Sequence, residues 1–239
     1  MSLLVCLRGA DGLVLATDSR GTFGDPRGVT AQNDAQKKLY VTNDMVGVML
    51  AGTGDIGAQV IAEFLGQPGV GELGITNFAM KLREIVRARF SQWFDKFSIQ
   101  QTPQDIRPAR PDLALIVAGY EENRQDIKIY QFISQFDFAP MLVNYGFALA
   151  GVAQYGLYLL NRLYDPTRTV EQLKHLAAYA ITETASQDGK VGGPVQMATI
   201  SPMKASTLEP AEVSAIVEAN KARSSALKAS FLGTETADA

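Results

Sequence analysis

The chain has 239 residues, of which 46% are hydrophobic and 20% charged, and its formal net charge at pH 7 is −3. This composition is typical of a globular protein, and the acidic balance argues against nucleic acid as a partner. No stretch approaches the ~20 consecutive apolar residues of a membrane span, and the apolar run at residues 3–7 lacks the basic segment of a signal peptide. The single cysteine, Cys6, excludes an internal disulfide and a cysteine-based zinc cluster, so we expect a reducing cytoplasm.

The first half of the chain alternates short β-rich runs with turns and then becomes helical. Strands are expected at residues 2–8, 12–17, 38–41 and 45–51. The polar, glycine-containing segment 19–36 is expected to be a loop. Helices are expected at 55–65 and 78–97, the second because its apolar residues recur at intervals of three and four.

The second half repeats this order of strands followed by helices. Three prolines between residues 103 and 111 mark an exposed polar loop. Strands are expected at residues 113–119, 127–132, 141–149 and 195–200, and helices at 152–164, 170–186 and from Pro210 onward.

The order of elements predicts an α+β fold. Hairpin links between strands imply antiparallel sheets, and grouped helices imply that helices cover the faces of those sheets. Two stacked sheets between two helical layers, a four-layer αββα sandwich, is the expected architecture. We find no internal repeat and no domain linker, so residues 1–239 are expected to form a single domain with a C-terminal helix and tail at 208–239.

The only histidine, His175, narrows the chemistry that the chain can perform. It falls in the helical segment 169–186, which begins with the capping-box residues Thr169 and Gln172. A lone helical histidine is usually a surface or boundary residue. Without a second histidine, the chain has no good candidate for the general base of a Ser-His-Asp or Cys-His mechanism. If the chain is an enzyme, its base is expected not to be an imidazole.

The N-terminus offers another nucleophile. Removal of Met1 would leave Ser2 with a free α-amine beside its hydroxyl. Such an amine has a reference pKa near 8, so it is partly neutral at physiological pH and can accept the hydroxyl proton directly. Serine at position 2 is also common in proteins with no such activity, where it only marks a permissive N-terminus.

The run G-L-V-L-A-T-D-S-R-G-T at residues 12–22 closely resembles the proteasome β-subunit family. Counting back from Asp18 places Ser2 on the family's N-terminal threonine without a gap. Further matches in order and spacing are K-K-L-Y-V (37–41), G-V-M-L-A-G-T-G-D (47–55), L-A-L-I-V-A-G-Y (113–120) and D-G-K-V-G-G (188–193). The resemblance covers about residues 2–200 and implies the αββα sandwich of the N-terminal-nucleophile hydrolases.

The resemblance also implies catalytic roles. Ser2 would attack the scissile carbonyl, Lys38 would lower the pKa of the hydroxyl and the amine, and Asp18 would hold Lys38 in place. The backbone N–H of Gly52 would stabilise the oxyanion, and Asp188 would support the N-terminal amine.

Three further residues match substrate-binding positions of the family. The backbone at Gly21 and Thr22 would pair with an extended peptide, a form of strand addition. Leu50 would line the pocket for the substrate side chain and favour an apolar residue.

Each of these site residues also has a structural explanation. Asp18 and Arg20 fit a turn that ends a strand, and Asp188 lies in a glycine-rich turn where aspartate is common. Lys37 and Lys38 could be a solvated pair, although strand alternation lets only one of them face the site.

The sequence departs from the family pattern at positions that bear on activity. The nucleophile is serine rather than threonine, the turn A-L-A-G-V-A-Q (148–154) lacks the hydroxyl of active members, and Val191 replaces a second family serine. The loop between Asp18 and Lys38 is also longer than usual. The missing hydroxyls favour an inactive ring scaffold or a peptide-binding subunit, whereas the absence of an N-terminal helical extension favours an active hydrolase, and both interpretations stay open.

The resemblance implies an assembly as well. We expect a homo-oligomeric ring or double ring with active sites facing a chamber, a peptide or unfolded-protein substrate, and neither a metal nor an organic cofactor. An ATP-dependent unfoldase is a possible partner, with the proline-rich loop 98–111 as a candidate contact.

Two rival interpretations are weaker. G-T-G-D-I-G at residues 52–57 matches the dinucleotide-binding fingerprint, but the hairpin signals before it argue against a βαβ unit. The cations Lys81, Arg83, Arg87 and Arg89 could suggest nucleic-acid binding, but such a face of an amphipathic helix in an acidic protein is usually solvated.

Overall fold

The computed structural model describes residues 2–25, 28–95 and 110–232. One antiparallel sheet has the strand order β10-β1-β2-β11-β12. Its strands are β1 (Leu3–Arg8), β2 (Leu13–Thr17), β10 (Phe147–Gly151), β11 (Gln196–Ile200) and β12 (Ala205–Thr207). Strand β1 is paired on both sides: Leu4 pairs with Thr17 of β2 and with Ala150 of β10.

The other five-stranded sheet is also antiparallel and has the order β5-β6-β7-β8-β9. Its strands are β5 (Leu39–Val41), β6 (Val46–Gly52), β7 (Leu113–Tyr120), β8 (Ile127–Ile133) and β9 (Met141–Leu142). Because β6 pairs antiparallel with β7, the glycine motif at 52–57 does not lie in a parallel βαβ unit.

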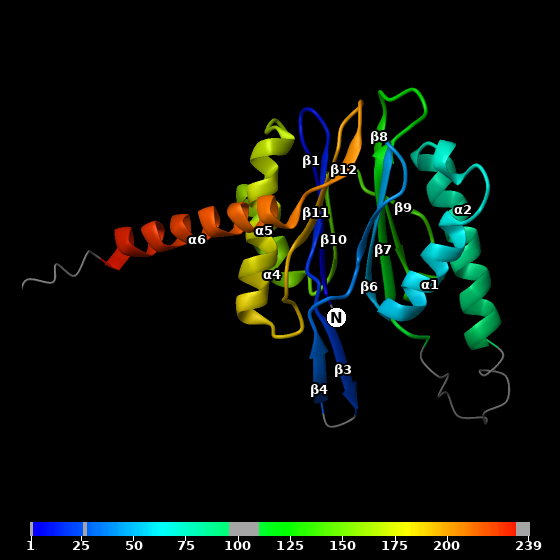
Figure 1. Ribbon diagram of the computed structural model, residues 1–239, viewed down its shortest axis with the longest axis horizontal. Helices are drawn as coiled ribbons and strands as arrows, with labels where there is room; N and C mark the ends of the chain where they lie inside the picture. The colour runs from blue at the N-terminus through cyan, green and yellow to red at the C-terminus, as the bar shows by residue number, and fades with distance from the viewer. Residues whose placement is uncertain (1, 26–27, 96–109, 233–239) are drawn as a thin grey trace, which may run out of the picture.

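Helices cover the outer faces of the two sheets (Figure 1). Helices α4 (Gln154–Leu163) and α5 (Val170–Gln187) lie beside the sheet that contains β1. Helices α1 (Gly54–Leu65) and α2 (Ile75–Phe90) lie beside the sheet that contains β6, and α2 continues into a π-helical turn, η2 (Ser91–Asp95). The expectation of a mixed fold with antiparallel sheets is therefore confirmed.

Alternation along β1 explains why this strand is buried on both faces. Leu3, Val5 and Leu7 belong to the apolar cluster shared with α5, whereas Leu4 and Cys6 belong to the cluster between the two sheets. Successive side chains of a strand point to opposite faces, so one short apolar run supplies two separate cores.

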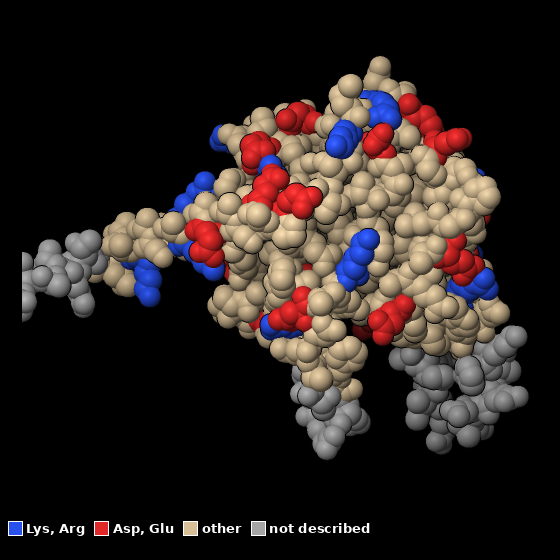
Figure 2. All heavy atoms as spheres, in the orientation of Figure 1, with Lys and Arg blue, Asp and Glu red and all other residues tan. Residues whose placement is uncertain are grey.

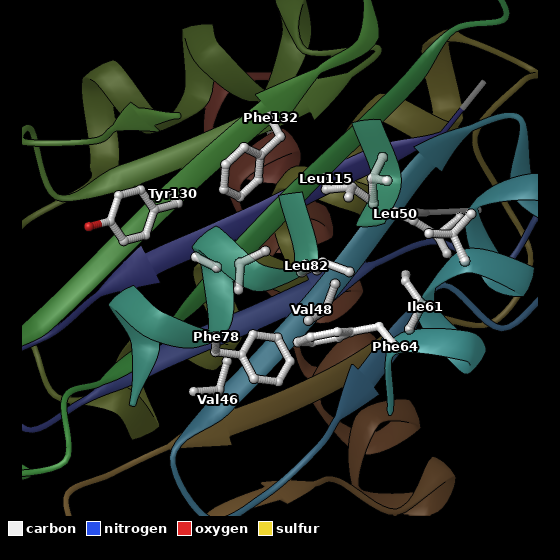
Figure 3. Close-up of a cluster of buried hydrophobic side chains, with 14 of the residues drawn as sticks. Val46, Val48, Leu50, Ile61, Phe64, Phe78, Leu82, Leu115, Tyr130 and Phe132 are labelled. Carbon is white, nitrogen blue, oxygen red and sulfur yellow. The ribbon is translucent and has the colours of Figure 1, made fainter. Parts of the chain in front are cut away.

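A third apolar cluster fills the space between the sheet that contains β6 and helices α1 and α2 (Figure 3). The rings of Phe64 and Phe78 meet edge to face with centroids 4.8 Å apart, and they join the two helices. Helix α1 thereby has a fixed position, with its N-terminus at the end of β6.

Helix α6 (Pro210–Leu232) begins against α5 and extends away from the body of the molecule (Figure 1). Its first turn is held by the ammonium of Lys174, which lies 2.8 Å from a Glu212 carboxylate oxygen. Further along, the Asn220 amide donates to the backbone oxygen of His175. Helix α5 starts at the predicted capping box, in which Thr169 and Gln172 bond reciprocally.

Three expectations for the strands were wrong. The segment 19–36 contains a hairpin, β3 (Gly21–Asp25) and β4 (Gly28–Asn33), and a short strand, β12, follows β11. The hairpin projects from the body, so it lacks the apolar alternation of a half-buried strand. Residues 141–149 form parts of two strands in different sheets. The extended backbone is interrupted at Gly146, whose φ is +87°.

The basic residues of α2 bond to neighbouring parts of the protein. Arg83 donates to the backbone oxygen of Phe138 at 2.7 Å, and Arg87 pairs with Asp137 at 2.6 Å. On the face drawn in Figure 2, basic and acidic side chains are interspersed and form no continuous basic band. This arrangement gives no support for a nucleic-acid interface on α2.

The remaining short elements are the 3₁₀ turns η1 (Val70–Glu72) and η3 (Ser134–Phe136). Among the described helices, none combines the length and the apolar character needed to cross a bilayer. The expected loop contact with an unfoldase at 98–111 falls largely outside the described residues, as does Met1.

Candidate active site

A cavity of about 550 Å³ opens where the start of β1, the β3–β4 hairpin and the N-terminus of α1 come together. Four of the predicted site residues line it: Ser2, Gly21, Thr22 and Gly52. Ser2 is only 4% exposed, so it contributes to the cavity from a largely enclosed position.

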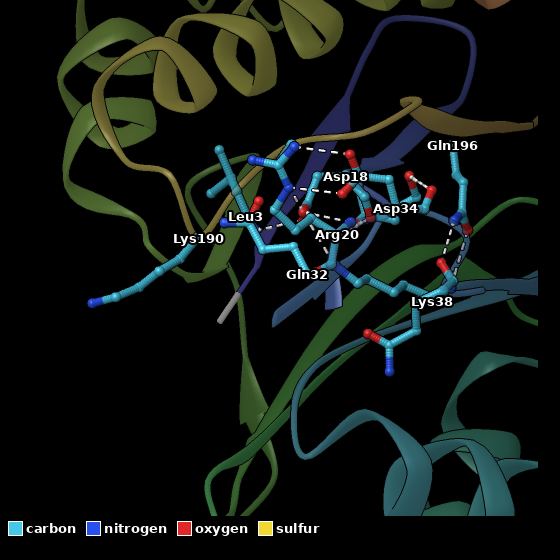
Figure 4. A network of polar contacts seen from close by, with 12 residues as sticks. Leu3, Asp18, Arg20, Gln32, Asp34, Lys38, Lys190 and Gln196 are labelled. Carbon is cyan, nitrogen blue, oxygen red and sulfur yellow. Dashed lines mark hydrogen bonds and ion pairs between the residues drawn. The ribbon is translucent and has the colours of Figure 1, made fainter. Parts of the chain in front are cut away.

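A buried ion pair is hydrogen-bonded to Leu3, the residue after Ser2 (Figure 4). The Lys38 ammonium is 3.1 Å from Asp18 Oδ2, and the two side chains are 1% and 0% exposed. The other carboxylate oxygen, Oδ1, accepts the N–H of Leu3 at 3.0 Å. One carboxylate therefore connects the residue after Ser2 with the lysine.

Backbone groups complete the environment of the Asp18 carboxylate. Its Oδ2 also accepts the N–H groups of Arg20 and Gly192, each at 3.1 Å. Three N–H donors and one ammonium thus surround a carboxylate that has no contact with solvent, and such donors stabilise its charged form.

Strand alternation separates the two adjacent lysines. Lys38, directly before β5, points inward to Asp18, whereas Lys37 is exposed with its ammonium 4.8 Å from the centre of the Tyr40 ring. The structure therefore brings Lys38, and not Lys37, to the site.

Burial lowers the pKa of Lys38 below its ordinary value of 10.5, and the nearby Asp18 carboxylate opposes that shift. The backbone oxygen of Arg20 accepts a further hydrogen bond from Lys38 Nζ at 2.6 Å. A lysine whose pKa is lowered gives up its proton more readily than a solvated one, which suits a group beside a nucleophile.

The lowered pKa of Lys38 has a testable consequence for stability. Between its folded pKa and 10.5, the folded protein binds fewer protons at this site than the unfolded chain does, so this contribution to stability increases as pH increases. We expect the difference in unfolding free energy between wild type and Lys38→Met to shift in favour of wild type from neutral pH to about pH 10. Urea titrations of both proteins measure this difference, and a pH-independent value would contradict the assignment.

The backbone around Ser2 is held by the turn after β10. The Ser2 carbonyl oxygen accepts the N–H of Val152 at 2.8 Å. Gly151 has a φ of +85°, and a Cβ at that position would overlap the same oxygen. Only glycine allows this approach, so residue 151 fixes the path of the first residues.

A second glycine shapes the entry into α1. Gly52 ends β6 with a φ of +103°, and a Cβ there would overlap the backbone oxygen of Asp112. The next residue, Thr53, donates its N–H to that oxygen at 2.7 Å. This turn brings Gly52 and the first turn of α1 to the wall of the cavity opposite the hairpin.

An ion pair holds the base of the hairpin, and the sequence did not single out its acidic partner, Asp34. The Arg20 guanidinium bonds to both oxygens of Asp34, at 2.7 and 2.8 Å, and to the backbone oxygen of Gly189 at 3.2 Å. Asp34 lies in the segment expected to be a loop, so no periodicity marked it. The pairing of Gly21 with Asn33 in the hairpin is what brings it opposite Arg20.

Two of the predicted residues, Asp188 and Leu50, neither line the cavity nor belong to the buried ion pair. Asp188 follows the last turn of α5, and its Oδ1 accepts the N–H of Lys190 at 2.9 Å. Leu50 is 1% exposed and packs in the core cluster shared with α1 and α2, so its side chain forms no pocket wall (Figure 3). In β6, side chains alternate between the two faces of the sheet, and the side chain of Leu50 points toward the helices.

The chain is similar in sequence to an archaeal proteasome subunit. It is 22% identical over 197 residues to proteasome subunit beta 2 of Pyrobaculum neutrophilum, a match that covers 82% of this chain and 87% of that protein. No protein-family profile matches the chain.

Solved structures of Anbu proteins have a similar fold. The helical assembly of the Anbu complex from Pseudomonas aeruginosa gives a TM-score of 0.73 at 18% identity, covering 99% of this chain and 100% of that one. Anbu (ancestral beta-subunit) from Yersinia bercovieri gives 0.70 at 15% identity, covering 98% and 99%. These comparisons support a proteasome-like fold and do not single out one member of the family.

Proposed function

We propose that the chain is an N-terminal-nucleophile amide hydrolase that cleaves peptides or unfolded proteins, with Ser2 as its nucleophile after removal of Met1. The arrangement of helices and sheets is then the αββα sandwich of that superfamily, formed by a single domain. The proteasome-like fold and the sequence similarity to a proteasome β subunit support this assignment.

One observation carries the proposal: the Asp18 carboxylate bonds both to the N–H of Leu3 and to the buried ammonium of Lys38. Burying an ion pair is costly, and this pair is hydrogen-bonded to the residue directly after the one that the mechanism requires. It positions a cation of lowered pKa near the start of the chain, where the nucleophile and its amine would lie.

In the proposed reaction, the hydroxyl of Ser2 adds to the substrate carbonyl while its proton passes to the neutral α-amine. The Lys38 ammonium stabilises the developing alkoxide, and the N–H of Gly52 stabilises the tetrahedral oxyanion. The amine then donates the proton to the leaving nitrogen as the C–N bond breaks. Water attacks the resulting ester by the same route and releases the acid.

The hairpin and the turn after α5 have supporting roles in this proposal. The backbone at Gly21 and Thr22 pairs with an extended substrate across the cavity. The family resemblance is the basis for assigning Asp188 to support of the amine, and its Oδ1 accepts the N–H of Lys190.

We further propose that copies of this chain assemble into a ring or double ring in the cytoplasm and receive substrate from an ATP-dependent unfoldase. The helical assembly described for the Pseudomonas aeruginosa neighbour supports an oligomer. An open helix instead of a closed ring is the alternative geometry for such an assembly.

A second candidate is a catalytically inactive subunit that forms a scaffold or binds peptides. It is favoured by Val191, which is fully buried in an apolar cluster where active relatives of the family carry a serine. The turn at 148–154 likewise offers no hydroxyl beside Ser2. Only a covalent readout at Ser2 separates the two candidates.

Intact mass and N-terminal sequencing of untagged protein, before and after treatment with a peptide epoxyketone or β-lactone, test the proposal. We expect a chain that begins at Ser2 and one adduct per chain, and no adduct in Ser2→Ala. Ser19→Ala serves as the matched control, because Ser19 is a buried serine that bonds to the backbone oxygen of Asp34. A chain that retains Met1 and forms no adduct would overturn the hydrolase and leave the inactive subunit.

A further inference from the structure

Polar and apolar atoms line the cavity beside Ser2 in equal measure, whereas the family resemblance predicts an apolar pocket. Leu50 is 1% exposed and packs in the cluster shared with α1 and α2. Leu50 is not among the residues that line the cavity, so it offers no surface to a substrate side chain there. Specificity must therefore come from the residues that do line the cavity.

Gln36 occupies the position between the hairpin and α1. A Cβ at Gly21 would lie 3.1 Å from its side-chain oxygen, and a Cβ at Gly54 would overlap its amide nitrogen. The amide thus fits between two glycines, one on each wall of the cavity. Any larger residue at either position would displace it.

The backbone of Gln36 is fixed, but its side-chain amide is available. Its N–H donates to the backbone oxygen of Ser19 at 3.0 Å, and its carbonyl oxygen accepts from the amide of Gln196 at 2.6 Å. Within residues 2–25, 28–95 and 110–232, no hydrogen bond engages the side-chain amide of Gln36. It therefore presents a donor and an acceptor to a ligand in the cavity.

The charges around the cavity are unbalanced. The cation of Arg20 is neutralised by its two bonds to Asp34. The other charged residues that line the cavity are Asp55, in the first turn of α1, and Asp112, whose carboxylate bonds to the Gln135 amide. The positive end of α1 offsets part of this charge, but two carboxylates exceed its half charge.

We propose that this cavity binds a basic side chain of the substrate, lysine or arginine, on the acyl side of the cleaved bond. Gln36 accepts a hydrogen bond from the ammonium or guanidinium group, and Asp55 and Asp112 supply the complementary charge. The inference rests on the proposed hydrolase function and replaces the apolar preference expected from Leu50.

Fluorogenic peptides that differ only at the residue before the cleaved bond test this substrate class. With wild type, we expect kcat/KM for arginine and lysine to exceed that for leucine by at least about tenfold, as charge-assisted hydrogen bonds predict. Gln36→Leu, Asp55→Asn and Asp112→Asn should each lower the ratio of arginine to leucine. Asp44→Asn, an exposed aspartate between β5 and β6, is the matched control and should leave the ratio unchanged.

The possible failures of this experiment are distinguishable. Equal or faster cleavage of the leucine peptide by wild type overturns the basic subsite and leaves the hydrolase function standing. An arginine preference that survives all three substitutions also overturns the assignment of these residues. Absence of cleavage of every peptide, together with absence of an epoxyketone adduct, overturns both the subsite and the function on which it rests.

Discussion

Replacing Asp18 with alanine is expected to lower the free energy of unfolding by about 3–5 kcal/mol, because removal of one partner of a buried ion pair leaves the other uncompensated. Lys38 is 1% exposed and would lose the Asp18 carboxylate. The N–H groups of Leu3, Arg20 and Gly192 would lose an acceptor as well. Equilibrium unfolding in urea measures the loss.

Two variants show whether the unpaired lysine causes this loss. Asp34→Ala removes an aspartate of the same network that is 43% exposed at its side chain, and we expect a much smaller effect because solvent screens its pair with Arg20. The double variant Asp18→Ala/Lys38→Met should recover part of the stability, because it removes the buried charge. Equal stability of Asp18→Ala and Asp34→Ala would show that the buried pair has no special role.

Lys38→Met is expected to reduce kcat/KM by about 10²–10³-fold, the usual cost of removing one group that stabilises charge in the transition state. Its effect on folding should be far smaller than that of Asp18→Ala. The reason is that Asp18 keeps its three backbone N–H donors, whereas Lys38 without Asp18 keeps only the backbone oxygen of Arg20. Hydrolysis of an arginine peptide and urea unfolding of the same samples measure the two effects.

Lys37→Met is the matched control for this prediction. The two lysines are adjacent, but Lys37 is exposed and contacts the Tyr40 ring. We expect Lys37→Met to keep activity within about twofold of wild type, as surface substitutions usually do. If both variants lose activity equally, the effect is not specific to the buried lysine.

The core strands could be predicted because their sequence carries a strong pattern. Buried runs such as those of β1 and β7 are bounded by turns, and the helices have apolar residues at intervals of three and four. The β3–β4 hairpin carries neither signal, because it projects from the body and its residues need not alternate between core and solvent. Its pairing depends on tertiary contacts such as that of Arg20 with Asp34.

Sequence motifs identified some residues of the site, but not the tertiary contacts that bring them together. Asp18 and Lys38 could be named because the sequence around each resembles the proteasome β-subunit family, but their contact joins segments 20 residues apart. Leu50 could not be placed, because its position depends on how α1 packs against β6. No sequence pattern marked Gln36 as a site residue, because its position in the cavity depends on the small size of the glycines at 21 and 54.

The contacts of Arg20 link the base of the hairpin to the buried ion pair. Its side chain fastens the hairpin to Asp34 and Gly189, while its backbone oxygen accepts a hydrogen bond from Lys38. A movement of the hairpin that shifts Arg20 therefore also shifts one acceptor of the lysine ammonium. A ligand that binds the hairpin and moves Arg20 would therefore change the proton affinity of Lys38. By thermodynamic reciprocity, the protonation state of Lys38 would change the affinity for that ligand by the same factor.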